Sequence, residues 1–309
     1  MDHSRVVAAN PYLYLAAGQY IGVFDISDPT APLFRGFWDF PALPEISAFI
    51  VQNDIAYVAS GSMLEILNLV PQCRFARVAR MDLPIQISRL QVEGDRLYVG
   101  GYSADDGPLH VDILSIVLPS QPETLSTIEL ERAVWSVHNE KLYSNVLGDV
   151  EKILVTDLGE PTNPRTMPVN INVEPEILTR SLPRFVKDTL YLLSDRGEVF
   201  IVNDLQAEIP AVRVIPEQYP FIEVFQVQDD YIFLGSNWCD VECTSRLWVL
   251  DAVNGTELSR LGLHPHYPVW QYLEIPENII YAFANDTLLV IDISDITNPM
   301  IIGEVPLLT

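Results

Sequence analysis

Short runs in which apolar and polar residues alternate recur along the whole chain, and turn-forming residues separate them. The second group of such runs covers residues 46–51, 55–60, 63–69 and 76–83, and it is rich in β-branched and aromatic residues. Alternation over a few residues with this composition predicts β-strands, because successive side chains of a strand point to opposite faces. No amphipathic pattern longer than two helical turns interrupts the series. The sequence therefore predicts an all-β chain built from units of four short strands.

Two independent markers repeat in step with these units. A small polar residue ends each third predicted strand, and an aromatic residue lies in the second. The polar residues are Asp25, Asn68, Ser115, Asp157, Asn203, Asp251 and Asp292, and the aromatic residues are Tyr14, Tyr57, Tyr98, Tyr143, Tyr191, Phe233 and Tyr281. Both series advance by 41 to 48 residues. This period is typical of a β-propeller blade, so we predict a seven-bladed β-propeller with four antiparallel strands per blade.

The predicted propeller forms a single domain over residues 1–309. Its blades are expected at about 5–41, 45–84, 86–130, 132–174, 177–216, 220–264 and 268–309. The favoured closure of the ring builds the first and last blades each from their own strands. In the alternative closure, residues 5–9 pair into the last blade.

The repeated phrase has a recognisable form. It reads "GVFDISDPTAP" at residues 22–32, "LVIDISDITNP" at 289–299 and "ILVTDLGEPTNP" at 153–164. These segments resemble the LVIVD repeat family of propeller proteins, and the other units match it only in pattern. The resemblance implies a seven-bladed propeller of a kind often found in secreted or surface proteins of bacteria and archaea. It supplies no catalytic residues.

The polar residue of the phrase has two readings, a ring of seven chemically active groups or a set of turn caps. Asp, Asn and Ser all accept hydrogen bonds from the backbone N–H groups of a following turn. A metal or acid–base site would not accept Ser115 in place of a carboxylate. We therefore interpret these residues as caps.

Charge narrows the classes of partner. The chain has 42 acidic and 18 basic residues, with a formal net charge of −24. Such a surface repels nucleic-acid phosphates and anionic lipid, so we expect no nucleic-acid partner. No apolar run reaches the length of a membrane span. We expect an extracellular or cell-surface protein whose leader is removed or absent from this chain, with the cytoplasm as the alternative.

Departures from the repeat mark the predicted binding face. The connections between the second and third strands are long at residues 102–110, 145–152 and 237–246, and the loops at 216–221 and 264–270 should open on the same side. Loops on a rigid scaffold commonly carry binding residues. The candidates are Tyr102, Asp105, Asp106, Asp149, Glu151, Trp238, Asp240, Glu242, His264, His266 and Tyr267. The expected ligand is another protein or a carbohydrate.

Metal binding by these loops is open. Asp105 and Asp106 lack the ordered ligand ladder of a calcium loop, and a proline separates His264 from His266. We predict no cofactor. Cys239 and Cys243 lie in one loop, where we expect a disulfide in an oxidising compartment. Free thiols or half of a metal site are the alternative in the cytosol.

Standard catalytic motifs are missing from the sequence, including the nucleophile elbow and the zinc-protease helix motif. We therefore expect a non-catalytic interaction or scaffolding propeller, in some settings a subunit of a larger assembly. The alternative is a metal-dependent hydrolase or lyase with its site at the mouth of the central channel. Four arginines on predicted inner strands either form salt bridges between blades, the favoured reading, or line the channel: Arg89, Arg132, Arg180 and Arg184.

Overall fold

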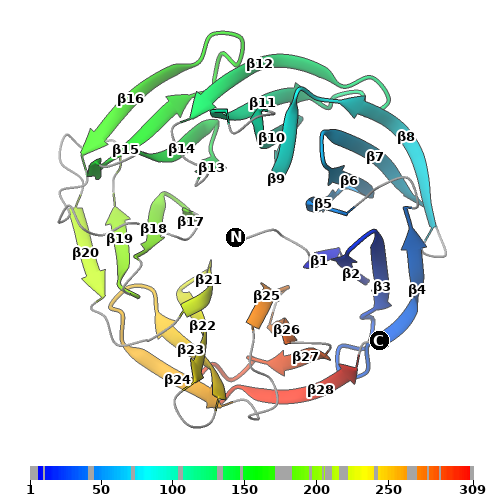
Figure 1. Ribbon diagram of the computed structural model, residues 1–309. Helices are drawn as coiled ribbons and strands as arrows, with labels where there is room; N and C mark the ends of the chain where they lie inside the picture. Colours follow the sequence, from blue (N-terminus) through cyan, green and yellow to red (C-terminus); the bar gives the residue numbers. More distant parts are fainter. Residues whose placement is uncertain are drawn as a thin grey trace. The chain divides into compact units, whose positions relative to one another are not determined.

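Seven sheets, each of four antiparallel strands that follow one another in the sequence, make up the computed structural model (Figure 1). The chain is a seven-bladed β-propeller, which confirms the predicted fold class. The structure describes residues 6–9, 11–40, 45–70, 74–103, 107–130, 135–146, 149–170, 183–194, 197–203, 205, 211–215, 222–239, 243–262, 270–276, 278–284 and 287–306. No helix occurs among these residues.

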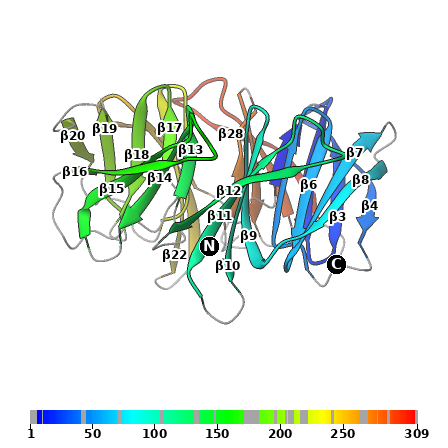
Figure 2. The same ribbon diagram turned by 90° about the horizontal axis from the view of Figure 1, so that it is seen from above.

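The first of two compact units contains residues 1–26 and 33–169 and holds four blades (Figure 2). Its strands are β1 (Val6–Ala9), β2 (Tyr12–Ala17), β3 (Tyr20–Asp25), β4 (Leu33–Asp39), β5 (Ala48–Gln52), β6 (Ile55–Ser60), β7 (Met63–Val70), β8 (Arg74–Asp82), β9 (Ile85–Glu93), β10 (Arg96–Ser103), β11 (Leu109–Ser115), β12 (Glu123–Leu130), β13 (Trp135–His138), β14 (Lys141–Val146), β15 (Asp149–Asp157) and β16 (Arg165–Asn170).

The second unit contains residues 27–32 and 170–309 and holds three blades. Its strands are β17 (Arg184–Val186), β18 (Thr189–Leu193), β19 (Val199–Asn203), β20 (Ala211–Ile215), β21 (Ile222–Gln228), β22 (Tyr231–Cys239), β23 (Cys243–Asp251), β24 (Glu257–Gly262), β25 (Trp270–Glu274), β26 (Ile279–Ala284), β27 (Thr287–Asp292) and β28 (Met300–Pro306).

The two terminal blades are each built from their own strands. Strand β1 pairs with β2, where Val6 lies opposite Leu15, and β28 pairs with β27. The favoured arrangement of the terminal strands is confirmed, and the alternative in which residues 5–9 pair into the last blade is wrong. The physical reason is local, because only two residues separate β1 from β2, and Ala9 at the end of β1 pairs with Tyr12 at the start of β2.

Each blade has two ends with different connections. We call the end with the turn between the first and second strands and the loop between the third and fourth strands the cap end. The other, called the connection end, has the hairpin between the second and third strands, and the chain leaves there for the next blade. The antiparallel order of every sheet fixes this division.

Apolar side chains on both faces of the middle strands hold neighbouring blades together. In β7, Leu64 and Ile66 pack toward the third blade, while Leu67 packs toward the first. The repeated aromatic residues belong to the same interfaces, and Tyr57 is 2% exposed. A single sheet could not bury both faces, so the stacking of blades supplies most of the buried apolar area.

One glycine is required where the third blade meets the fourth. A Cβ atom on Gly100 of β10 would lie 2.5 Å from Cζ2 of Trp135, which is itself fully buried. Since real Cβ atoms do not approach other atoms so closely, only glycine lets the indole ring lie against this strand.

The repeated phrase closes the cap end by a hydrogen bond that recurs in six blades. The residue after the repeated polar residue is apolar in each, and its N–H donates to a carbonyl in the turn between the first and second strands. The pairs are Ile26 to Pro11, Leu69 to Asp54, Ile116 to Asp95, Leu158 to Glu140, Ala252 to Asp230 and Ile293 to Asn278, at 2.8–2.9 Å. The phrase therefore joins the third strand to the first turn of its own blade.

The predicted capping role is confirmed at three repeated aspartates. Asp157 accepts the N–H of Gly159 at 2.9 Å, Asp292 accepts that of Ser294 at 2.8 Å, and Asp251 accepts the N–H groups of two residues at 2.7 and 2.8 Å. The N–H and hydroxyl of Ser294 hold the pKa of the Asp292 carboxyl below its usual value of 3.8. Other members of the series have different partners, since Asp25 accepts from the Arg35 guanidinium.

Candidate interaction surface

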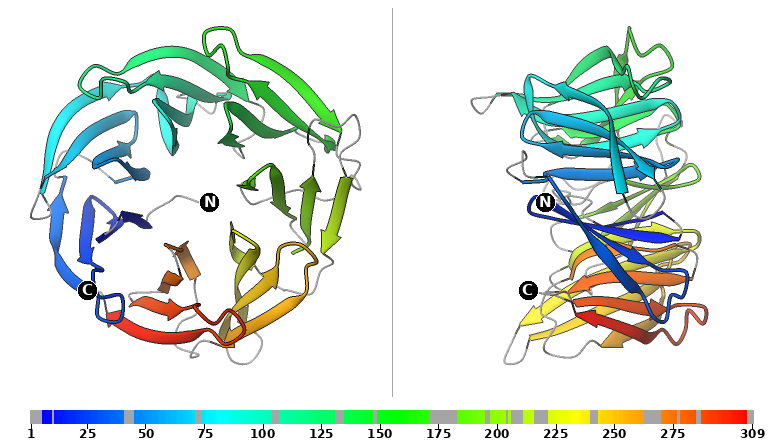
Figure 3. Two further views of the ribbon diagram at one scale, coloured as in Figure 1. Left: turned by 180° about the vertical axis from the view of Figure 1, so that it is seen from behind. Right: turned by 90° about the vertical axis from the view of Figure 1, so that its right-hand side faces the viewer.

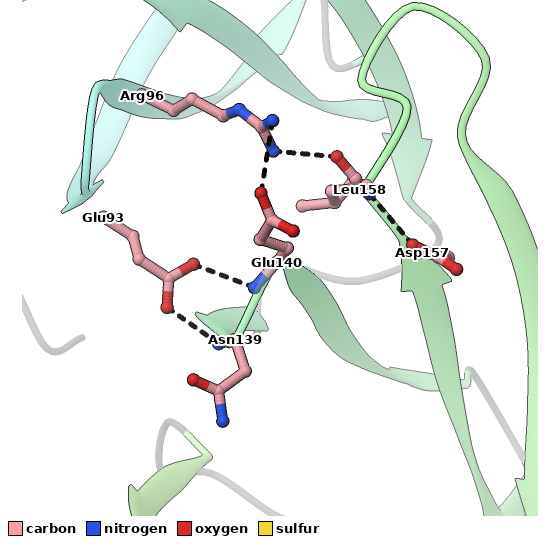
Figure 4. Close-up of polar contacts among 7 residues, drawn as sticks. Glu93, Arg96, Asn139, Glu140, Asp157 and Leu158 are labelled. Carbon is pink, nitrogen blue, oxygen red and sulfur yellow. Dashed lines mark hydrogen bonds and ion pairs between the residues drawn. The ribbon is translucent and has the colours of Figure 1, made fainter.

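The cap ends of the third and fourth blades are joined by a compact polar network (Figure 4). The two carboxylate oxygens of Glu93 accept the backbone N–H groups of Asn139 and Glu140 at 2.7 and 3.1 Å. Arg96 donates to the carbonyl of Leu158 at 2.8 Å and lies 3.3 Å from the Glu140 carboxylate. The polar groups of this network contact one another between the two blades, so they serve the scaffold rather than a ligand.

The same kind of contact recurs at other cap ends. Arg213 donates to the carbonyl of Ala252 at 3.1 Å, at the position that corresponds to Leu158. The Ser259 hydroxyl donates to the carbonyl of Ile296 at 2.6 Å, and the Ser126 hydroxyl donates to the carbonyl of Pro161. The loop of the repeated phrase is therefore an acceptor surface for the preceding blade. We assign the cap ends to the scaffold.

Inner strands also use polar residues to hold the next blade. Gln91 donates to the carbonyl of Val137 at 2.6 Å and accepts its N–H at 2.9 Å. The guanidinium of Arg89 lies 4.9 Å from the centre of the Trp135 ring, a cation–π contact. In the second unit, Arg184 donates to the carbonyl of Phe225 at 3.4 Å.

These contacts refine the expectation for the inner arginines. Arg89 and Arg184 both reach the first strand of the following blade, through a ring and a carbonyl oxygen, so salt bridges of these two arginines to acidic neighbours stay a prediction. Arg132 and Arg180 lie outside the described residues. For those two, the choice between salt bridges and a channel lining stays a prediction.

At the connection ends of the first two blades, short hairpins are hydrogen-bonded to the chain that leaves for the next blade. The carbonyls of Gly18 and Gly61 each accept an N–H at 2.7 Å, from Ile46 and Ile87 respectively. Both glycines have a positive φ, 57° and 58°, which their two-residue turns demand. These two hairpins are short, and each contributes one hydrogen bond to the scaffold.

The sixth blade has a different connection end. Strands β22 and β23 continue past the rest of their sheet, pairing Asn237 with Ser245 and Cys239 with Cys243. In the described residues, the pairing of β21 with β22 reaches Ser236, and that of β24 with β23 reaches Arg246. We call residues 237–239 and 243–245 the arm. Among the described strands, nothing flanks the arm on either side within its blade.

The predicted binding residues are only partly described. Tyr102 lies at the connection end of β10 and is 42% exposed. The backbones of Asp149 and Glu151 lie on β15, and that of Trp238 lies on β22 in the arm. Seven others lie outside the described residues: Asp105, Asp106, Asp240, Glu242, His264, His266 and Tyr267. Their gathering on one face stays a prediction.

Within the described ranges, no three His, Cys, Asp or Glu residues lie close enough together to hold a metal ion. Of the metal-dependent alternative, both histidines and the carboxylates of Asp105, Asp106, Asp240 and Glu242 fall outside those ranges. Burial raises the pKa of the repeated tyrosines Tyr57 and Tyr281 to about 12, so both phenols stay protonated at neutral pH. No helix that could cross a bilayer occurs in the part of the chain that the structure describes.

Sequence reasoning missed two buried carboxylates at equivalent positions, three residues before the repeated polar residue. Glu65 in β7 is 2% exposed and pairs with Arg77 of β8 at 3.0 Å. Asp112 in β11 is 4% exposed and accepts the Thr127 hydroxyl at 2.5 Å. The signal that could have found them is an acidic residue at a repeat position that other blades fill with apolar residues.

Comparisons with known proteins support the fold and part of the family assignment. The model of the LVIVD repeat matches residues 2–39 and 273–306, which are the first and last blades. No curated protein matches the chain significantly. The three solved structures described below are 11–12% identical to it in sequence, so the likeness extends to the fold alone.

Three of these structures illustrate the range. A proposed 6-phosphogluconolactonase from Bacteroides uniformis has a TM-score of 0.71 at 11% identity, covering 96% of this chain and 97% of its own. Kluyveromyces lactis Hsv2 has a TM-score of 0.65 at 11% identity, covering 96% of both. PorZ of Porphyromonas gingivalis, a surface component of the type-IX secretion system, has a TM-score of 0.64 at 12% identity and covers all of this chain but 38% of its own.

The repeat match falls on the two terminal blades whose phrases are most regular, and the seven sheets supply the architecture. The chain therefore carries the LVIVD repeat in its first and last blades, within a propeller of seven four-stranded sheets.

Proposed function

We propose that this chain is a non-catalytic binding or scaffolding propeller that contacts another protein through its connection ends. The arm of the sixth blade is the observation that carries the proposal. It adds three residue pairs beyond its own sheet, and none of the described strands of the blade pairs with it. A scaffold does not need such an extension, whereas a binding surface does.

The physics of a two-stranded ribbon supports this reading. A ribbon with no third strand is marginally stable in water, because it buries little apolar surface and leaves backbone groups unpaired on both edges. The arm gains order when a partner covers it. Trp238 lies on the arm, and tryptophan is enriched among residues that dominate binding energy at protein interfaces.

A location outside the cell or on its surface belongs to the same proposal. The strongly acidic composition suits a soluble surface-exposed protein, and PorZ is a surface component that shares the fold. An assembly in which this propeller is one subunit would use the connection ends for docking. The carbohydrate alternative has no support among the described residues, so we do not carry it into the proposal.

Capture from the surface fraction of native cells tests the proposal. The bait is the full chain, and the arm variant replaces residues 237–245 with a two-residue Asn-Gly turn. The control is Asp251→Ala, which alters the cap end of the same blade. We expect the wild type and the control to retain the same proteins and the arm variant to lose them. Identical capture by all three baits, or no capture by the wild type, would contradict the proposal.

A further inference from the structure

The outer strand of the second blade combines a free sheet edge with an unusual concentration of positive charge. Strand β8 is last in its sheet and pairs only with β7 among the described strands; it is cyan in Figure 3. It has nine residues, more than any other outer strand. Three of the 18 basic residues of the chain lie on it, Arg74, Arg77 and Arg80, against a single aspartate.

A β-bulge directs two of these arginines to the same face. Arg80 lies opposite Glu65 and Arg77 lies opposite Leu67, while Val78 is the extra residue. Glu65 and Leu67 are two residues apart on β7 and therefore share a face. In a regular strand, residues 77 and 80 would point to opposite faces. The bulge thus gathers two guanidinium groups beside the free edge, a re-aiming of side chains that bulges commonly perform.

The two guanidinium groups remain available to solvent. Arg77 is 59% exposed even though it pairs with the buried Glu65 carboxylate at 3.0 Å, and Arg80 is 39% exposed. The contact between Arg80 and Asp82 is 3.8 Å, longer than a hydrogen bond, and Asp82 is itself 72% exposed. Such a pair contributes little energy and is easily exchanged for another carboxylate.

From these features we infer that β8 is a docking edge for an acidic, extended segment of a partner protein. The segment adds as a fifth strand, with its backbone groups pairing to the free edge of β8. Its carboxylates meet Arg77 and Arg80, whose planar guanidinium groups suit carboxylate oxygens. Charge complementarity selects this partner, because the rest of the chain is strongly acidic and repels acidic segments elsewhere. The inference does not depend on the function proposed for the connection ends.

Binding of a labelled peptide to the full chain tests the inference. The probe is a fluorescein-labelled octapeptide of alternating Glu and Val, followed by fluorescence anisotropy. One control peptide has Lys in place of Glu. A second is N-methylated at every backbone amide nitrogen, which removes its backbone hydrogen-bond donors and keeps its charge. We expect the wild type to bind only the unmodified acidic peptide, and more weakly as salt is raised.

Two matched variants locate the binding. Arg80→Glu keeps both partners of the pair between Arg77 and Glu65 but places a carboxylate opposite Glu65, so the unfolding curve of this variant is measured beside that of the wild type. Arg260→Glu is the control, since Arg260 is 63% exposed on β24, the outer strand of the sixth blade. We expect Arg80→Glu to weaken binding by about tenfold or more, and Arg260→Glu to change it by less than about twofold.

Four outcomes would overturn the inference. These are no binding by the wild type, equal binding of the N-methylated peptide, equal effects of the two variants, and self-association of the wild type that Arg80→Glu abolishes. Equal binding of the N-methylated peptide would show attraction without strand addition. Self-association would assign the edge to a second copy of this chain.

Discussion

The two ends of each blade differ in what their hydrogen bonds accomplish. At the cap ends, the same N–H to carbonyl bond closes six blades, and Arg96 and Arg213 make equivalent contacts with the next blade. At the connection ends, the first two blades have short hairpins, each hydrogen-bonded to the chain that leaves for the next blade. The sixth blade instead extends an arm past its sheet. Uniform contacts indicate a structural requirement that every blade shares, and varied ones indicate freedom to acquire a function.

The difference between the two ends of a blade also explains the role of the repeated aspartates. The repeated aspartates are on the cap ends, where Asp157, Asp251 and Asp292 accept backbone N–H groups. Their carboxylates are already committed to local turns. One such polar residue in each of seven blades could have suggested a ring of reactive groups. In the blades where the contact is described, the structure instead shows turn caps.

The largest expected effect comes from emptying a cap-end core position. Leu158 follows the repeated aspartate of the fourth blade and is fully buried. Leu158→Ala should lower the free energy of unfolding by about 2–4 kcal/mol, because the cavity it leaves cannot fully collapse. At a connection end, Tyr102→Ala should cost less than about 1 kcal/mol, since Tyr102 is 42% exposed. Urea unfolding of both variants measures the two losses of free energy. Equal losses would contradict the difference between cap ends and connection ends.

A smaller loss is expected from removing one cap. Asp251 accepts two backbone N–H groups, from Val253 and Asn254. Asp251→Ala should lower the free energy of unfolding by about 1–2 kcal/mol, while Asp251→Asn, which keeps one acceptor oxygen, should cost less. Unfolding curves for the two variants would sharpen the scaffold assignment of the cap ends. If the free energy of unfolding of Asp251→Ala equals that of the wild type, the scaffold assignment of this blade's cap end is wrong.

Acid should weaken the same kind of cap. Because the pKa of Asp292 is lowered in the folded state, its stabilising contribution is complete above its usual value of 3.8 and is lost as the pH falls through the folded-state value. The stability gap between the wild type and Asp292→Ala should therefore be present at neutral pH and shrink at about pH 2.5. Denaturant unfolding at both pH values checks this, and a gap that does not change with pH would contradict it.

The smallest expected effect concerns the two cysteines of the arm. The backbones of Cys239 and Cys243 lie directly opposite each other at its tip, which supports the predicted disulfide. Protein from its native host should then be about 2 Da lighter without reduction than with it, because each disulfide replaces two thiol hydrogens. Two free thiols in native protein would rule the disulfide out.

The sequence was sufficient for the blades but not for their contacts. Asp157 and Tyr143 belong to series of residues that repeat every 41 to 48 positions, and alternation of apolar and polar residues marks the strands. The local pattern therefore predicts each blade. Gln91 and Arg96 reach the next blade only because of the angle and spacing between sheets, which no local pattern encodes. Glu65 stands at a repeat position that other blades fill with apolar residues, so the sequence alone could have marked it as unusual. Its partner Arg77 becomes apparent only once the strand register and the bulge are known.

Loop length predicted exceptional connection ends for the third, fourth and sixth blades, and Tyr102 is 42% exposed at one of them, but binding by these loops stays a prediction. The extension of β22 and β23 into an arm was not predicted, because polar residues such as Asn237 and Ser245 resemble loop residues rather than strand residues. Pairing between the two segments, rather than the propensity of either, makes them strands.

The separation of scaffold from binding surface is tested most directly by the unfolding free energy of the variant that replaces residues 237–245 with an Asn-Gly turn. If the arm serves binding alone, this value should lie within about 0.5 kcal/mol of the wild type, as expected for a surface change away from the core. A loss of about 2 kcal/mol or more would show that the arm supports the sixth blade, and would contradict the account.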